Sequence, residues 1–557
     1  GNRIGVEFAR LGPLADNGGP TMTHALLGNS PAIDAGSNQK AIDVGLTVDQ
    51  RGIDRFRDGG LEAGRIDIGA YEAMATPTTF MVTTELDEDD GSLGVGAGDS
   101  LREVINAANA NVGVDAIVFD SGLASVITLT AGGLPTIVDD VSITGPGAQN
   151  LAVGDNPTAT IFRIDNDAEV EISGLTIRGG SRGIQNFGAL TVSESFITGH
   201  VNQNANDLGG GIQNYQGTLR LEDSTVAHNS ADSGAGIWTW GDLTVVNSTI
   251  SSNTADEGGG LLLFDGAALL SSVTVADNTG AGIIRDYGIL TLHNTIVAGN
   301  TSTSQFSQIV NSLDPASSHN LIGVQGAYQS LGIDDGVNGN RIGVEFARLG
   351  PLADNGGPTM THMPFGGSSA IDAGSNLHAT DAGLTLDQRG EDRFVDGGSG
   401  SLQVDVGAVE FRDEIAPTAV LDAPDEVVVG QNLLLDGTGS SDVLPGQIET
   451  YRWSRVGGLL NGQAVVETTV PTLTVSSIGY PAGTVAFELV TIDHAGNHST
   501  PASVDVVFVL PPIDLYFSSP PVVEVVSGGT VTVGEQLRLR LSPENLRPAA
   551  ATNAQLV

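Results

Sequence analysis

Charged side chains cluster near position 220, where they could act on a sugar substrate. Arg220, Glu222 and Asp223 stand within one short stretch, and Asp242 follows about one structural repeat later. Hydrolysis of a glycosidic bond needs two carboxyl groups that face the same sugar ring, and the sequence does not localise such a pair. The alternative is that these residues form a solvated outer face. They are the catalytic candidates of the chain, weighed against that alternative.

Two acidic loops offer the oxygen ligands that calcium prefers, which are six to eight oxygens on flexible loops. Their candidate metal ligands are Asp87, Asp89, Asp90, Asp387, Asp392 and Asp396. The competing interpretation is that aspartate and glycine merely form turns, or that Asp387 pins its loop through an ion pair with Arg389 or Arg393. Calcium is the only cofactor that the sequence suggests.

Aromatic residues recur at the spacing of a structural repeat. Trp238 and Trp240 are preceded by Tyr215 and followed by Phe264, and the outer members of the series are Phe187 and Tyr287. If Trp238, Trp240 and Tyr215 share an outward face, they could stack on sugar rings and bind carbohydrate. Alternatively, some members of the series fill the core.

Histidines give weaker signals. His200 occupies a position where related segments carry asparagine, which favours a substituted turn residue over a catalytic base. His24 and His362 return in an identical motif, and without a second nearby histidine each is expected to make buried hydrogen bonds. No Ser–His–Asp order with a nucleophile elbow is visible.

Composition excludes several classes of protein. The 557 residues carry a formal charge of −43, and Lys40 is the only lysine. A field this negative disfavours nucleic acid and anionic membranes, because both need clustered cations. There are no cysteines, so disulfides and thiolate metal sites are absent. No apolar run reaches the ~18–20 residues of a membrane span, so no transmembrane segment is expected.

A long internal repeat organises the chain. Residues 1–24 recur without change at 339–362, an offset of 338, and the match continues without a gap through 73 and 411. We call residues 1–73 the leading copy and residues 339–411 the returning copy. The repeat predicts the end of one β-helix unit at 1–73 and a complete unit at 80–412, as part of a longer array.

A shorter period of about two dozen residues lies inside the complete unit. The segments at 189–195, 218–224, 242–248, 267–273 and 289–295 alternate apolar and polar residues, which is the pattern of a strand with one buried face. Asn229, Asn253, Asn278 and Asn300 recur in register behind them, so their amides are expected to stack. Coils of this length must stack to bury their apolar faces. The pattern predicts an all-β fold, a right-handed parallel β-helix solenoid of the pectate-lyase-like type.

One amphipathic helix is expected to cap the stack. In the segment 100–111, Ser100 and Glu103 can form a capping box, and Leu101, Val104 and Ile105 share an apolar face with Ala108. The returning copy would close the other end.

Several motifs resemble modules of bacterial surface proteins. GDSLREVINAANAN at 98–111 resembles the CSLREA motif that opens many surface β-helix proteins, with Asp99 in place of the family's cysteine. PLADNGGPTMTHALLGNSPAIDAG at 13–36, DQRG at 49–52 and DIGAYE at 67–72 resemble the choice-of-anchor Q domain, which precedes varied surface-sorting signals. The second copy of that module lies at 351–410.

The composition changes after Pro417. Residues 433–455 and 483–499 resemble a PKD-type, immunoglobulin-like β-sandwich, with Asp442, Trp453 and Asp493 among its features. VLPG after Asp442 departs from the usual acidic pair before glycine. We place this domain at 416–511 and the start of a further, truncated β-module at 512–557.

Together these features favour a secreted bacterial surface protein, a stalk built for display or adhesion without catalysis. Its expected partners are extracellular polysaccharides or cell-surface glycans, and its expected location is extracellular or on the bacterial surface. The alternative is a carbohydrate-active enzyme, a polysaccharide lyase or glycoside hydrolase with accessory domains. Lyases of the pectate type resemble the expected fold and use calcium with an Arg or Lys base. Lysine is absent from the coils, and the Gly-His-Gly and Arg-x-Lys motifs of polygalacturonase-like hydrolases do not occur.

Overall fold

The computed structural model describes most of the chain. The described residues are 4, 9–28, 30–56, 65–74, 77–123, 125–202, 208–302, 308–325, 330–395, 402–413, 415–443, 446–511, 523–525 and 537–539. The chain divides into two compact units. The first comprises Gly1–Ile415 with the short segments Val443–Gln447 and His494–Gly496, and the second comprises Ala416–Asp442, Ile448–Asp493 and Asn497–Val557.

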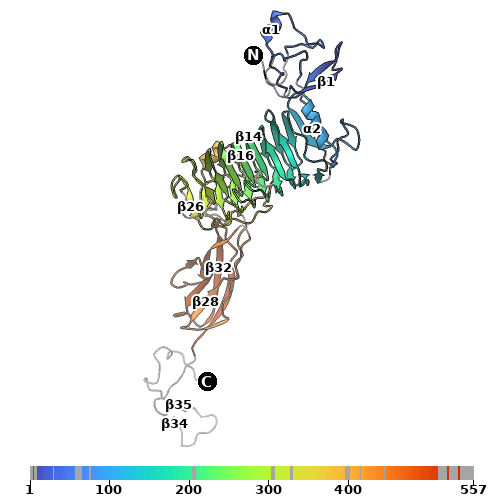
Figure 1. Ribbon diagram of the computed structural model, residues 1–557. Helices are drawn as coiled ribbons and strands as arrows, with labels where there is room; N and C mark the ends of the chain where they lie inside the picture. The colour runs from blue at the N-terminus through green and yellow to red at the C-terminus, as the bar shows by residue number, and fades with distance from the viewer. Residues whose placement is uncertain are drawn as a thin grey trace. The chain divides into compact units, whose positions relative to one another are not determined.

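The first unit contains a parallel β-solenoid of about nine turns, which we call the coil stack. Its strands pair in parallel with their counterparts in the neighbouring coils and form two long sheets (Figure 1). The ten-stranded sheet consists of β5 (Val126–Thr128), β7 (Ala152–Gly154), β10 (Thr176–Arg178), β13 (Phe196–Thr198), β15 (Thr225–Ala227), β17 (Thr249–Ser251), β20 (Thr274–Ala276), β23 (Ile296–Ala298), β25 (Leu321–Gly323) and β26 (Arg341–Val344).

The second sheet of the coil stack has fourteen strands. They are β3 (Thr79–Val82), β4 (Asp115–Phe119), β6 (Val141–Thr144), β8 (Thr160–Ile164), β9 (Glu169–Ser173), β11 (Arg182–Asn186), β12 (Ala189–Ser193), β14 (Ile212–Glu222), β16 (Ile237–Val246), β18 (Leu261–Asp265), β19 (Ala267–Ser271), β21 (Ile283–Arg285), β22 (Ile289–His293) and β24 (Ile309–Val310).

The core of the coil stack is built from aligned apolar rows. One row runs through neighbouring strands in register as Val170, Leu190, Leu219, Leu243, Ala268 and Leu290. A second row runs as Ile172, Val192, Leu221, Val245, Leu270 and Leu292. All of these side chains are buried. The alternation seen in the sequence therefore places every second side chain inside, as predicted, and leaves Leu269 outside.

The expected asparagine ladder is present beside these rows. Asn229 Nδ2 donates to Asn253 Oδ1 at 2.9 Å, Asn253 Nδ2 to Asn278 Oδ1 at 3.0 Å, and Asn278 Nδ2 to Asn300 Oδ1 at 2.9 Å. All four side chains are buried. The ladder gives the buried polar groups at the coil bends partners that repeat from coil to coil.

His200 continues this ladder with a ring in place of an amide. Its Nε2 lies 3.0 Å from the Ile177 carbonyl oxygen, just as Asn229 Nδ2 donates to the Ile197 carbonyl one coil on. Its Nδ1 accepts a hydrogen bond from the Gly180 backbone N–H at 3.0 Å. Burial lowers the pKa of His200 to about 4, so the ring is neutral near pH 7. The interpretation of His200 as a substituted turn residue agrees with these contacts.

Helix α2 (Leu101–Ala110) lies at the start of the coil stack (Figure 1). Ser100 and Glu103 form a complete capping box. Leu101, Val104 and Ile105 are buried and belong to the same apolar cluster as the coil rows. The helix therefore continues the core of the stack with its apolar face, as the sequence predicts.

The two copies of the long repeat have the same local structure. The leading copy contains β1 (Leu11–Ala15), β2 (Thr23–Leu26) and α1 (Asn38–Asp43). The returning copy contains α3 (Asn376–Asp381) at the position of α1, and its antiparallel bridge between Ala353 and Thr361 matches the Ala15–Thr23 pairing of β1 with β2. Asp67 Oδ1 accepts from the Asp34 N–H at 2.7 Å, and Asp405 Oδ1 accepts from the Asp372 N–H at the same distance.

The second unit is a separate β-sheet domain. Its five-stranded sheet has the order β27 (Glu426–Val428), β33 (Ala502–Val509), β32 (Gly483–Asp493), β29 (Ile448–Arg455) and β30 (Val465–Thr468). A second sheet pairs β28 (Asn432–Asp436) with β31 (Thr472–Ser476), and β34 (Val523–Val525) pairs antiparallel with β35 (Leu537–Leu539). Trp453, Phe487 and Phe508 lie in its core.

The predicted fold class is confirmed, since the chain is mostly β with a parallel β-solenoid and a separate C-terminal β-sheet domain. Among the described helices, none has both the length and the apolar character that crossing a lipid bilayer requires.

Candidate functional site

Six aromatic side chains form a continuous strip on the fourteen-stranded sheet. Neighbouring rings along the strip have centroids between 5.0 and 6.1 Å apart, in stacked, tilted and edge-to-face arrangements. We call these residues the aromatic strip: Phe187, Tyr215, Trp238, Trp240, Phe264 and Tyr287. The strip crosses five coils, because each coil supplies one ring and β16 supplies two.

Strand geometry directs these rings outward. On β16, Ile237 and Thr239 are fully buried and alternate with Trp238 and Trp240. Because successive side chains of a strand point to opposite faces, the two tryptophans share the outer face. Tyr215 lies on β14, in the preceding coil, and is in register with Trp240 of β16. The predicted carbohydrate-binding residues Trp238, Trp240 and Tyr215 are therefore brought together.

Members of the strip differ in how much of each ring solvent can reach. Tyr215 and Phe264 are each 36% exposed and Tyr287 is 65% exposed, whereas Trp238 is only 3% exposed. A Cβ at Gly234 would lie 2.8 Å from the Trp238 Cβ, so the loop backbone covers that tryptophan closely. Trp238 is therefore covered and stacks between Tyr215 and Phe264, while Tyr215, Trp240, Phe264 and Tyr287 offer ring surface to a ligand.

Polar groups flank one end of the strip. The Arg163 guanidinium lies 4.5 Å from the centroid of the Phe187 ring, and it also donates a hydrogen bond to Gln185. Gln185 Nε2 in turn donates to Gln213 Oε1 at 2.7 Å. Aromatic surface beside aligned hydrogen-bonding groups is the combination that binds a molecule with both apolar faces and hydroxyl groups.

The four catalytic candidates do not form one cluster. Arg220 and Glu222 are paired with each other and partly exposed. Asp223 accepts a hydrogen bond from Asn247, and burial raises its pKa to about 6. Asp242 is in register with Thr218, four residues before Glu222 on β14. Its Oδ1 accepts from the Ala267 N–H at 3.1 Å.

In the first acidic loop, Asp87 is engaged by several donors. It accepts hydrogen bonds from Arg102 Nε at 2.8 Å and from the Thr130 and Ala131 N–H groups at 2.6 and 2.8 Å. Asp89 accepts from Asn106 Nδ2 at 3.3 Å, and the Asp90 N–H donates to Glu103 Oε1. Asp87 therefore ties the loop to α2.

The second acidic loop is pinned by Asp387. Its Oδ2 accepts from Arg389 Nη2 at 2.7 Å and from the Glu410 N–H at 3.0 Å. Asp392 is largely exposed and lies 3.8 Å from Arg412, and Asp396 lies outside the described residues. These contacts match the loop-pinning interpretation of Asp387, and calcium binding by either loop stays a prediction.

His24 and His362 both hydrogen-bond within their own copies. His362 Nδ1 lies 2.7 Å from the Gly350 carbonyl oxygen, and His24 Nδ1 lies 2.8 Å from the Gly12 carbonyl oxygen. The expectation of burial holds for His362, which is 1% exposed, and is wrong for His24, which is exposed. The reason is that His362 lies against Ser251 of the coil stack at 2.7 Å.

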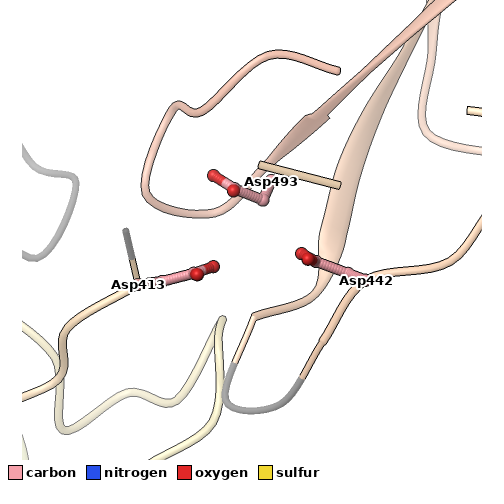
Figure 2. A group of neighbouring side chains, drawn as sticks. All are labelled: Asp413, Asp442 and Asp493. Atoms are coloured by element: carbon pink, nitrogen blue, oxygen red, sulfur yellow. The ribbon is translucent and has the colours of Figure 1, made fainter. Parts of the chain in front are cut away.

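A pair of carboxylates in the β-sheet domain was not anticipated as a pair. Asp442 and Asp493 offer oxygens within 4.8 Å of each other (Figure 2), and the figure also draws Asp413, which belongs to the first unit. Asp493 is fully buried, and its Oδ1 accepts from the Asn497 N–H at 2.8 Å. Both aspartates belong to the motifs described above, but they are far apart in the sequence, so the sequence does not predict that their carboxylates lie close together. Two carboxylates fall short of the oxygen count of a calcium site.

Comparison with known proteins gives no assignment. No protein-family description matches the sequence, and no curated protein resembles it significantly.

Proposed function

We propose that this chain is part of a bacterial cell-surface or secreted protein whose coil stack displays the aromatic strip to extracellular polysaccharide. The observation that carries the proposal is the strip itself, in which rings from five consecutive coils lie within 6.1 Å of their neighbours. Coils repeat every ~4.8 Å, so a rigid, linear series of rings faces a ligand. A linear sugar polymer has the shape and the apolar ring faces to lie along it.

The negative charge of the chain favours neutral over acidic polysaccharides as ligands. The chain carries a formal charge of −43, and a field of that sign repels polyanions and lowers their local concentration. We therefore propose neutral polysaccharides as the preferred ligands, with acidic polymers bound more weakly or only at high salt.

The modular organisation supports display at a surface. In this proposal α2 with its capping box is the CSLREA-like cap of the stack, and the two copies of the long repeat are modules of the choice-of-anchor Q type. The β-sheet domain is then the PKD-type module, and calcium is a candidate ligand of the acidic loops. A repetitive stack with neighbour-to-neighbour packing is a mechanically simple spacer, which suits a stalk or adhesin.

A glycan-binding panel tests the proposal. The full chain is measured by affinity electrophoresis against neutral polymers such as a β-glucan, a xylan and a galactomannan, and against pectate and alginate as acidic polymers. We expect binding to at least one neutral polymer. The double variant Tyr215→Ala/Trp240→Ala should bind about tenfold more weakly or worse, a loss of ~1.4 kcal/mol.

The matched control is Phe346→Ala, because Phe346 is an aromatic residue outside the strip and 73% exposed. It should leave binding unchanged. Binding that survives the double variant, or that Phe346→Ala weakens equally, would contradict the proposal. The same panel is assayed for reducing and unsaturated ends, because their release would favour a polysaccharide lyase or hydrolase instead.

A further inference from the structure

The returning copy packs one face against the ten-stranded sheet of the coil stack. We call this set of residues the docking face: Thr359, Met360, His362, Ser375, Gln388, Arg393, Gly407 and Ala408. Its partners on the stack are the Asp223 backbone carbonyl and serine, threonine and asparagine residues that recur from coil to coil. The docking face therefore hydrogen-bonds to polar residues that occupy equivalent positions in successive coils.

Gln388 joins two neighbouring coils. Its Nε2 donates to Thr225 Oγ1 at 2.9 Å and to the Ser224 carbonyl oxygen at 3.1 Å, and its Oε1 accepts from Thr249 Oγ1 at 2.7 Å. Gln388 is 1% exposed. Such a buried amide, with both ends bonded, fixes the register of the returning copy on the stack.

The backbone near Gly407 makes a second close approach. The Gly407 N–H donates to the Asn294 carbonyl oxygen at 2.7 Å, and the Ala408 N–H donates to Thr274 Oγ1 at 3.1 Å. A Cβ at Gly407 would lie only 2.7 Å from Ile296 Cδ1. Glycine is therefore required there by proximity as well as by its positive φ of 105°.

The leading copy carries the same docking face without change. Its eight counterparts are Thr21, Met22, His24, Ser37, Gln50, Arg55, Gly69 and Ala70. Its internal scaffold is also formed, since Arg51 pairs with Asp49 at 2.8 Å and Arg55 with Glu72 at 3.3 Å. Gln50 Nε2 already bonds Thr21 Oγ1 at 2.7 Å, matching the Gln388–Thr359 bond of 2.9 Å.

In the leading copy much of this face is bare. Met22 is 61% exposed and Ile68 is 41% exposed, whereas Val406, the counterpart of Ile68, is 2% exposed. Gln50 and Ala70 are exposed too. A Cβ at Gly69 would meet no atom within 4 Å, so the close approach that demands glycine at 407 is missing at 69, although the φ of Gly69 is also positive, at 125°.

We infer that the leading copy is a preformed clasp whose docking face binds the polar sheet of a second parallel β-coil stack, of the kind formed by residues 224–296. We identify this partner from the returning copy, because the same eight residues there bind such a sheet. The inference does not depend on polysaccharide binding, so either can fail alone.

The two copies differ at one position that contacts the stack, and this difference should determine which stack each copy prefers. The returning copy places His378 against His293 and Ser318, whereas the leading copy has Lys40 at the equivalent position. A stack that suits the leading copy should therefore offer Lys40 a carboxylate or carbonyl in place of the imidazole of His293.

Hydrogen exchange tests the inference in an extended chain. Residues 74–338 are added in front of Gly1, so that the new junction repeats the natural one between Asn338 and Gly339. Because the added stack carries His293, Lys40→His is made in the leading copy of both the extended and the 557-residue chain. We expect amide exchange around Gln50 and at 68–70 to slow about tenfold or more relative to the 557-residue chain. The peptide at 406–408 in the same molecule is the reference for a docked face. Unchanged exchange at 68–70 would overturn the inference.

Two further variants keep the test decisive. Gln50→Ala in the extended chain should restore faster exchange at 68–70 without changing it at 406–408. A length-neutral chimera, in which residues 1–73 with Lys40→His replace 339–411, should keep slow exchange at the grafted 68–70 and a melting temperature within a few degrees of the parent. A chimera that folds but exchanges fast there would also overturn the inference.

Discussion

The imidazole rings of His293 and His378 stack face to face, with centroids 3.9 Å apart and planes inclined by 9°. His293 ends β22 and His378 lies in α3 of the returning copy, while Ser318 Oγ lies 2.6 Å from His378 Nε2. The His319 ring lies 6.0 Å from that of His378. Two imidazolium cations at this separation would repel each other, so the stack depends on neutral rings.

This cluster predicts a loss of stability in mild acid. Burial first, and then repulsion from His378 and His319, lowers the pKa of His293 to about 4, although Asp314 and Asp381 oppose the shift. The pKa values of His319 and His378 are also lowered, chiefly by burial, and Asp381 opposes the shift at His378. Lowered folded-state values mean that the unfolded chain binds more protons below ~6.5. Stability is therefore complete above that pH and falls as the pH approaches 4.

The variant His378→Phe measures how much of the acid-dependent loss of stability comes from this histidine cluster. Phenylalanine can stack on His293 but cannot be protonated. The denaturation midpoint and the amide exchange of α3 should change less between pH 7 and pH 5 than in the parent chain. The control is His228→Gln, at an exposed histidine, which should reproduce the parent profile. A parent profile that is flat over this range would contradict the prediction.

Leucine truncations should separate the inner from the outer face of the coils. Leu221 is fully buried in an apolar row and Leu269 is 38% exposed on the outer face. Leu221→Ala leaves a cavity and should cost ~2–5 kcal/mol, whereas Leu269→Ala should cost less than ~1 kcal/mol. Denaturant titration of both variants measures the difference, and similar losses would argue against a dry inner row.

The asparagine ladder should be sensitive to a single break. Asn253→Ala removes the Oδ1 acceptor of the buried Asn229 backbone N–H, at 3.0 Å, and the side-chain donor to the Val226 carbonyl oxygen, at 2.9 Å, so these buried polar groups lose those partners. Each such group costs ~1–3 kcal/mol, so the melting temperature should drop by several degrees. The exposed Asn166 supplies the control Asn166→Ala, which should melt like the parent.

His200 should be replaceable by the ladder residue and by little else. Asparagine can donate to the Ile177 carbonyl and accept from the Gly180 N–H, the two contacts that the ring now makes. His200→Asn should therefore retain most of the stability, while His200→Ala should cost ~2–4 kcal/mol through lost packing and unpaired groups. Thermal denaturation at pH 7 distinguishes them, and equal losses would show that the ring is not acting as an amide substitute.

Sequence predicts what is periodic. The inward row through Leu190, Leu219 and Leu243, the amide ladder and the capping box at Ser100 follow from local spacing, because each depends on neighbouring coils or on one helical turn. The outward aromatic strip follows from the same alternation along β16.

Contacts between distant segments were not predictable in the same way. Gln388 meets Thr225 across 163 residues, and His378 meets Ser318 across 60 residues. Neither shows a period, since the returning copy runs along the stack only once. The exposure of His24, beside the burial of His362 in an identical stretch, shows that tertiary surroundings rather than sequence decide such residues.

The coil-by-coil register also allows the length of the aromatic strip to change without a change in how the interior of the coil stack is packed. Each coil packs only on its neighbours, so a whole coil could be duplicated or deleted without redesigning any other part of the interior. Such an event would lengthen or shorten the ring series by one step of ~4.8 Å. Ligand length could thus be tuned in whole increments during evolution, by copying a segment rather than by reshaping a pocket.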